Sequence, residues 1–269
     1  MVKRRGLIDE LFGEGSICTI FSPPGYGKTN LACKLFEKAV QKGYHIYTVI
    51  NFFPEDQIET ALKKGYLPSY YIDPKTSKKV SINYVPKHPN IHVTFYLSKV
   101  LEGLLSTKKN NFTLDEAAFF AGSTESMTKK VRQLKLLAYT IRKLNSSLLI
   151  IAQSKGSIVP ALRDELVEYE LRIERDENPK LKPNERRRDL VIYRRVHRAG
   201  FEEVPLFQYV MTIRGITPTV YPFDSKFLPK FTMDIDLEEF FDRIGQYNSL
   251  EVRKYARSIL EELKNESTY

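Results

Sequence analysis

Residues Ser22 to Thr29 read Ser-Pro-Pro-Gly-Tyr-Gly-Lys-Thr, a stretch that combines two glycines with a lysine and a hydroxyl residue. Gly25 and Gly27 can adopt positive φ values, which turn successive backbone N–H groups toward one point and form an anion-binding nest. Lys28 is placed to reach the β- and γ-phosphates of a nucleotide, and Thr29 can offer its hydroxyl to Mg²⁺. The stretch is therefore predicted to be a phosphate-binding loop.

The segments on either side of the loop agree with this prediction. Residues 16–21 (SICTIF) are an apolar run typical of a buried strand, and residues 30–40 (NLACKLFEKAV) have the apolar spacing of a helix. The N-terminal dipole of such a helix also favours phosphate. The residues expected to contact the nucleotide are Pro24, Gly25, Tyr26, Gly27, Lys28, Thr29 and Asn30. The alternative is a strand-to-helix turn that happens to contain Gly-Lys-Thr.

The loop departs from the usual pattern at its first position, where Ser22 stands in place of glycine. Glycine at this position relieves crowding where the strand enters the loop. Serine is small enough for the loop still to close, so we keep the prediction.

Composition limits the class of protein. The chain has 269 residues, 42% of them hydrophobic, which suffices for a core in one large domain or in one domain with a small appendage. A formal charge of +9 favours a polyanionic partner. The two cysteines, Cys18 and Cys33, do not form a disulfide framework and fit a reducing compartment. Without an apolar run of about 18 residues or a signal core, the protein is expected to be soluble and cytoplasmic, with no membrane span.

Strand and helix patterns alternate over the first part of the chain, which favours an α/β fold with a mostly parallel sheet. A turn at residues 73–76 indicates a β-hairpin insertion within about residues 66–90. Further strands are expected at residues 45–52, 90–97, 111–114, 147–152, 169–175, 189–196 and 207–213, and the main helices at 127–145, 236–244 and 249–264. We therefore predict a core over residues 1–175, and a basic hairpin and C-terminal helices packed on that core over residues 176–269.

Three further residues complete the predicted active site. Asp115 ends a short apolar strand and is placed to hold Mg²⁺ through water, and the adjacent Glu116 can activate the attacking water. Gln153 ends another apolar strand, where it can sense the γ-phosphate, because parallel strands end at the ligand crevice. The alternatives are an exposed acidic turn for the carboxylates and a simple strand terminator for Gln153.

Arg163 and Arg172 follow Gln153 along the chain. Either could act as an arginine finger that stabilises transition-state charge in a neighbouring subunit, and either could equally be a surface residue.

The segment from Ser147 to Ile173 resembles the FtsK/HerA class of P-loop motors, in which a strand ending in Gln precedes an Ile-Pro-x-x-Leu-Arg-like segment and an Arg-Ile pair. The matching residues are Gln153, Ile158, Pro160, Leu162, Arg163, Arg172 and Ile173, together with Lys28, Thr29, Asp115 and Glu116. The resemblance covers roughly residues 14–175. It implies a RecA-like core with the Gln153 strand between the phosphate-loop strand and the Asp115 strand, an arginine acting in trans, and a hexameric ring ATPase that moves DNA in a prokaryotic or virus-infected cell.

The densest basic segment is expected to contact nucleic acid through phosphates, without reading sequence. Its candidate residues are Arg186, Arg187, Arg188, Arg194 and Arg195. A solvated loop or a subunit interface would explain these arginines as well.

The function predicted from these observations is an ATP-dependent nucleic-acid motor that uses ATP and Mg²⁺, acts on DNA, most readily double-stranded, and assembles as a homo-oligomeric ring. An AAA+-type switch or loader acting on a partner protein is the alternative, because the loop is also similar to that family's. A P-loop small-molecule kinase and a module that binds ATP without hydrolysing it are the remaining interpretations.

Overall fold

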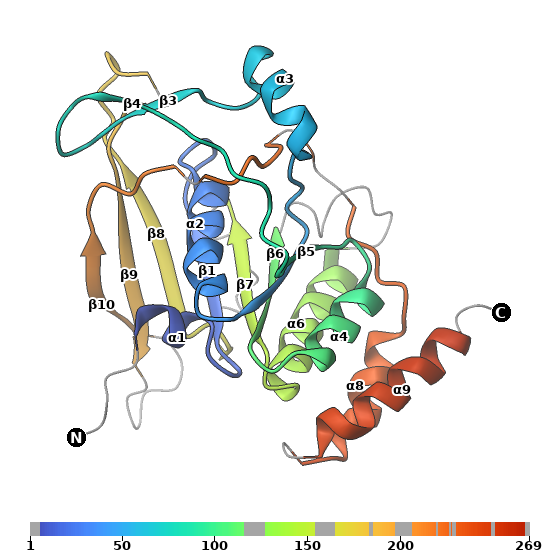
Figure 1. Cartoon of the computed structure of the whole chain (residues 1–269). Helices are drawn as coiled ribbons and strands as arrows, with labels where there is room; N and C mark the ends of the chain where they lie inside the picture. Colours follow the sequence, from blue (N-terminus) through green and yellow to red (C-terminus); the bar gives the residue numbers. More distant parts are fainter. Residues whose placement is uncertain are drawn as a thin grey trace.

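A computed structural model of the chain describes most of its length. The described residues are 6–115, 127–153, 165–182, 185–196, 206–218, 220–225, 227, 230–248 and 251–266. They form one large sheet with helices on both faces, and a small separate hairpin (Figure 1).

The large sheet has eight strands in the order β10-β9-β8-β1-β7-β6-β2-β5. Their bounds are β1 Ile17–Phe21, β2 His45–Thr48, β5 Ile91–Val93, β6 Asn110–Asp115, β7 Ser147–Ala152, β8 Tyr169–Arg175, β9 Arg188–Val196 and β10 Leu206–Ile213. The strands from β8 to β5 are mutually parallel, whereas β9 and β10 are added as an antiparallel extension next to β8. The predicted α/β class with a mostly parallel sheet is confirmed.

The centre of the sheet is formed by β1 between β7 and β8. All six residues of β7 are buried, as expected for a central parallel strand covered on both faces. β7 also lies between β1 and β6, which is the order that the RecA-like prediction requires. This order brings the ends of β1, β6 and β7 to the same edge of the sheet.

Each face of the sheet is covered by its own helices. On one face, α2 (Lys28–Val40) packs with the short α1 (Leu7–Leu11) over Cys18 and Ile20. On the other, α4 (Leu97–Ser106) and α6 (Met127–Lys143) pack over Ile17 and Leu148. The C-terminal helices α8 (Leu237–Gly245) and α9 (Val252–Glu266) lie outside α4 and α6 (Figure 1).

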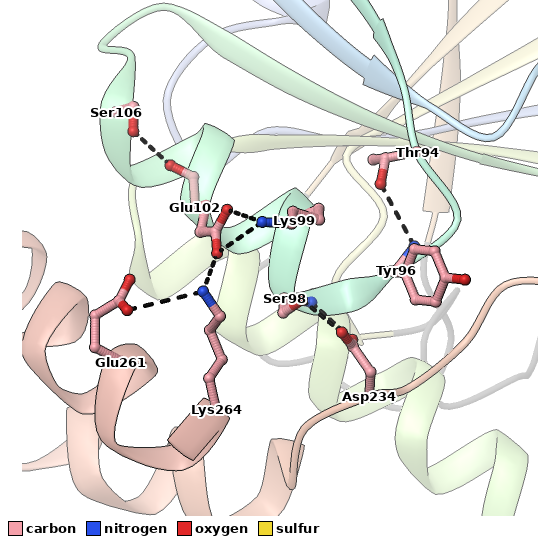
Figure 2. Close-up of polar contacts among 9 residues, drawn as sticks. All are labelled: Thr94, Tyr96, Ser98, Lys99, Glu102, Ser106, Asp234, Glu261 and Lys264. Carbon is pink, nitrogen blue, oxygen red and sulfur yellow. Dashed lines mark hydrogen bonds and ion pairs between the residues drawn. The ribbon is translucent and has the colours of Figure 1, made fainter. Parts of the chain in front are cut away.

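Hydrogen bonds and ion pairs join α4 to the segment that contains α8 and α9 (Figure 2). Asp234, just before α8, accepts hydrogen bonds from the backbone N–H of Ser98 at 2.9 Å and from its hydroxyl at 2.5 Å. Near the end of α9, Lys264 forms an ion pair with Glu102, which also pairs with Lys99 at 3.0 Å. Residues from 188 onward thus contribute both to the large sheet and to its helical cover, while the division of the chain at residue 175 stays a prediction.

Arg253 of α9 makes several of the hydrogen bonds that hold this segment against the rest of the fold. Its guanidinium donates to the carbonyls of Leu104 at 2.5 Å and Thr107 at 2.6 Å, at the C-terminal end of α4, and to Leu144 at 2.8 Å, just after α6. Helix ends leave their last carbonyls without intrahelical partners, so one side chain satisfies the ends of two helices.

The predicted hairpin insertion is present as β3 (Tyr70–Ile72) paired with β4 (Lys79–Ser81), preceded by the 3₁₀ turn η1 (Glu55–Gln57) and α3 (Ile58–Lys63). Two strands of the large sheet are shorter than predicted. β2 ends at Thr48, whose hydroxyl accepts a hydrogen bond from the N–H of Ile50 and turns the chain. β5 ends at Val93, before α4 begins at Leu97.

Within the described ranges, every helix is too short or too polar to traverse a lipid bilayer.

Candidate nucleotide-binding site

The stretch from Ser22 to Thr29 joins β1 to α2 and has the backbone geometry of an anion-binding nest. Gly25 has φ 77° and Gly27 has φ 97°, values that residues with a Cβ rarely adopt. Gly27 is the N-cap of α2, and because it has no side chain, no side-chain hydrogen bond caps the helix. Lys28 and Thr29 are the first two residues of α2. The positive end of the helix dipole is therefore at the loop.

Ser22, at the unusual first position of the loop, forms a bridge between β1 and β8. The side chain is 2% exposed, and its Oγ lies 2.9 Å from both the backbone N and the backbone O of Ile173. The register of β1 and β8 ends at Phe21 and Arg172, so the hydroxyl contacts the backbone of the next residue along β8. Glycine could not make this contact, which is a structural reason for serine here.

Lys28 lies over the loop. Its Nζ donates to the carbonyls of Ser22 at 2.6 Å and Pro23 at 3.2 Å. Burial lowers the pKa of Lys28, and the electrostatic attraction of Asp115 opposes this shift. Lys28 and Asp115 thus interact from the ends of α2 and β6, although 87 residues separate them in the sequence.

Gln153 and Arg172 line one cavity of about 430 Å³ beside the first residues of the loop. Gln153 follows β7, and Arg172 extends from β8. Among the described residues, those that line the cavity are Phe21, Ser22, Pro23, Gln153, Glu170, Arg172, Tyr193 and Phe207. Glu116 and Arg163, the predicted water-activating carboxylate and one candidate arginine finger, lie outside the described residues.

The hairpin formed by β8 and β9 folds over the other side of the phosphate loop. Arg175, the last residue of β8, stacks on the ring of Tyr26 with its Cζ 4.1 Å from the centroid, and donates to the carbonyl of Gly25 at 3.4 Å. Tyr26 donates its hydroxyl to Glu177 in the hairpin loop. The sequence analysis did not identify Arg175 as a site residue. The available signal was its position at the C-terminal end of a strand after the phosphate-loop core.

The five arginines assigned to nucleic acid do not form one cluster. Arg186, Arg187 and Arg188 are at the loop end of the hairpin, as the predicted pairing of the strands implies. A Cβ placed on Gly27 would lie 3.5 Å from Nε of Arg188, so this arginine packs on the phosphate loop itself. Arg194 and Arg195 are at the opposite end of β9, roughly 20 Å away at about 3.3 Å per residue.

The strand order and the phosphate loop, with a carboxylate at the end of β6, define an α/β fold of the RecA-like type. No protein-family model matches the sequence, and no curated protein resembles it in sequence.

Several solved structures have a similar backbone trace. A RadB recombinase is 18% identical, with a TM-score of 0.41, over 75% of this chain and 91% of that one. A KaiC-like protein from the archaeon Pyrococcus horikoshii is 12% identical, with a TM-score of 0.43, over 74% and 94%. The N-terminal domain of zonular occludens toxin from Neisseria meningitidis is 16% identical, with a TM-score of 0.36, over 74% and 95%. These scores are low, so the fold assignment rests on the strand order and the loop.

Proposed function

We propose that the protein is an ATPase that binds ATP with Mg²⁺ at the phosphate loop and couples hydrolysis to movement along a nucleic acid. The observation that supports hydrolysis best is the electrostatic attraction of Asp115, at the end of β6, for Lys28, at the start of α2, near the edge of the sheet where β1 and β7 also end. Phosphate-binding N–H groups, a cation for the β- and γ-phosphates and a carboxylate for a hard metal ion are thereby combined in one place.

The donor set suits a magnesium nucleotide. The positive φ values of the two loop glycines turn backbone N–H groups toward a phosphate. A hydroxyl and a carboxylate supply oxygen ligands, which Mg²⁺ prefers. Thr29 and Asp115 would hold the metal, Asp115 through water. When bound, Mg²⁺ supplies neutralisation of the charge that develops on the phosphates. Glu116 would orient the attacking water, and Gln153 would contact the γ-phosphate.

ATP turnover by the wild type, Lys28→Ala and Glu116→Gln tests this proposal. We expect Lys28→Ala to lose ATP binding, and Glu116→Gln to bind ATP but hydrolyse it about 100-fold more slowly or worse, because general-base assistance contributes that much. Wild-type protein that neither binds nor hydrolyses ATP would refute the proposal.

The motor function is the finer part of the proposal. The excess of 42 Lys and Arg over 33 Asp and Glu supports a polyanionic partner, for which we propose DNA. A ring of copies, working in the cytoplasm, would allow Arg163 or Arg172 to reach a neighbouring copy's nucleotide.

The motor function is tested by measuring ATP turnover with and without double-stranded DNA. The oligomeric mass of the protein is measured in the same buffer. Hydrolysis that rises with DNA and requires assembly is expected. If the protein remains monomeric and DNA does not change its ATP turnover, the switch or kinase interpretation replaces the motor interpretation.

A further inference from the structure

We propose that the β8–β9 hairpin (residues 169–196) is part of the nucleotide site and that Arg188 binds the α- and β-phosphates of the nucleotide held by its own chain. This inference rests on the proposed function, and it adds a residue outside the phosphate-loop motif. It also assigns Arg188 to the nucleotide in place of nucleic acid.

The position of Arg188 supports this role. Its Nε and Cδ lie 3.5 and 3.6 Å from the point where a Cβ on Gly27 would be, and Asn30 lies near the same point at 3.7 Å. Gly27 precedes Lys28, and the N–H groups of this part of a phosphate loop cradle the α- and β-phosphates. The guanidinium extends beyond Nε, so it is within side-chain reach of a phosphate seated there.

The charges around Arg188 point to an anion as well. Burial lowers the pKa of Arg188, and the positive charge of Arg175 lowers it further, although an arginine stays protonated. Two like charges beside the positive end of α2 repel each other in the absence of a ligand. A polyphosphate at the loop would relieve that repulsion, and arginine is well suited to bidentate phosphate binding.

In the structure, Glu177 partly balances the charge of Arg175, the nearer neighbour of the loop tyrosine. It pairs with Arg175 at 3.5 Å and with Arg186 at 3.6 Å, and it accepts a hydrogen bond from Tyr26 of the loop. The carboxylate is 59% exposed, and exposed ion pairs contribute little free energy. A bound nucleotide can therefore compete with Glu177 for Arg175 while the hairpin stays against the loop.

The test compares Arg188→Gln with Arg188→Lys and with Lys180→Gln. The last removes a positive charge from the exposed loop of the same hairpin and serves as the matched control. Affinities for ATP and for ADP, each with Mg²⁺, are measured by isothermal titration calorimetry, and turnover is measured at saturating ATP. Far-UV circular dichroism and thermal unfolding establish that each variant is folded.

We expect Arg188→Gln to weaken ATP and ADP by a similar factor of roughly 10 to 100, the size of a lost charge-assisted hydrogen bond. The factor should be similar because the α- and β-phosphates are common to both nucleotides. Turnover at saturating ATP should change little, because the loss of an interaction that serves only binding raises KM and leaves kcat unchanged. Arg188→Lys keeps the positive charge but loses the bidentate geometry, so its affinity should lie between those of the wild type and Arg188→Gln, and Lys180→Gln should match the wild type.

Unchanged affinity in folded Arg188→Gln would overturn the inference, as would a loss of turnover with affinity intact, which would place Arg188 in the hydrolysis step. If wild-type protein binds neither nucleotide, the proposed function itself fails. If the wild type binds ATP, Lys28→Ala does not, and Arg188→Gln does so normally, only the role of Arg188 is refuted.

Discussion

Replacing Ser22 with alanine tests whether the serine at the start of the phosphate loop stabilises the fold. The substitution removes the hydroxyl that lies 2.9 Å from the backbone N and O of Ile173, at a site where Ser22 is 2% exposed. A buried polar group left without its partner destabilises by about 1–3 kcal/mol. With both backbone groups of Ile173 affected and partial relaxation, we expect a loss of about 2–3 kcal/mol. For a chain of this size, that corresponds to a decrease of roughly 4–12 °C in Tm.

The assay is urea unfolding followed by circular dichroism, with thermal unfolding as a second measure and no nucleotide present. Ser22→Gly restores the residue that the motif normally has, yet it should lose at least as much stability because it also lacks the hydroxyl. Ser81→Ala, at an exposed position of β4, is the control and should change the free energy of unfolding by less than about 0.5 kcal/mol. If Ser22→Ala is as stable as this control, the bridge to β8 does not contribute and the reasoning is wrong.

Other predictions concern the parts of the fold that support the site. Gly103→Ala would place its Cβ 2.0 Å from Cε1 of Tyr47, and we expect a loss of about 3 kcal/mol in urea unfolding from this overpacking; a loss below 0.5 kcal/mol would contradict the packing. Arg253→Met removes the donors to four carbonyls at the ends of α4 and α6 and should destabilise by about 3 kcal/mol, with the protease sensitivity of α9 increased; unchanged cleavage would show that these hydrogen bonds do not hold α9 in place. Burial raises the pKa of Cys18 to about 12 and also raises the pKa of Cys33, so neither thiol should react with a disulfide reagent at pH 8 until the protein is unfolded. Because both pKa values are raised in the folded state, the two thiols should make the protein less stable as the pH rises above about 8.5, the value in the unfolded chain; a flat profile up to pH 10 would contradict their burial.

The sequence was informative where one local pattern determines the structure. The two glycines predicted a loop with positive φ, and the strands predicted at residues 147–152 and 169–175 match β7 and β8 to the residue. A helix was predicted to begin at Asp236, and the carboxylate of this residue caps α8 by accepting hydrogen bonds from the backbone N–H groups of Glu238 and Glu239. These features depend on neighbours within a few positions of the chain.

The sequence was less informative where distant segments meet. The bridge from Ser22 to Ile173, and the packing of Arg188 on Gly27, depend on which strands are adjacent in the sheet. The five arginines are close in sequence, but an extended strand separates Arg188 from Arg194 in space. A count of charges along the chain cannot reveal that separation. The roles of Glu116 and Arg163 stay predictions, since both lie outside the described residues.

The position of β1 in the sheet has a consequence for how the protein folds. β1 is completed early in synthesis, but both of its neighbours come much later: Ile17 pairs with Leu148, and Cys18 pairs with Tyr169. At about 5–20 residues per second, a ribosome needs roughly 7–30 s to make the intervening chain. During that time the backbone N–H and C=O groups along both edges of β1 have no strand partners, and closing so long a loop slows folding. The strand that carries the phosphate loop therefore stays open to pairing with other chains until β8 leaves the ribosome, and before then α1 and α2 can cover one of its faces.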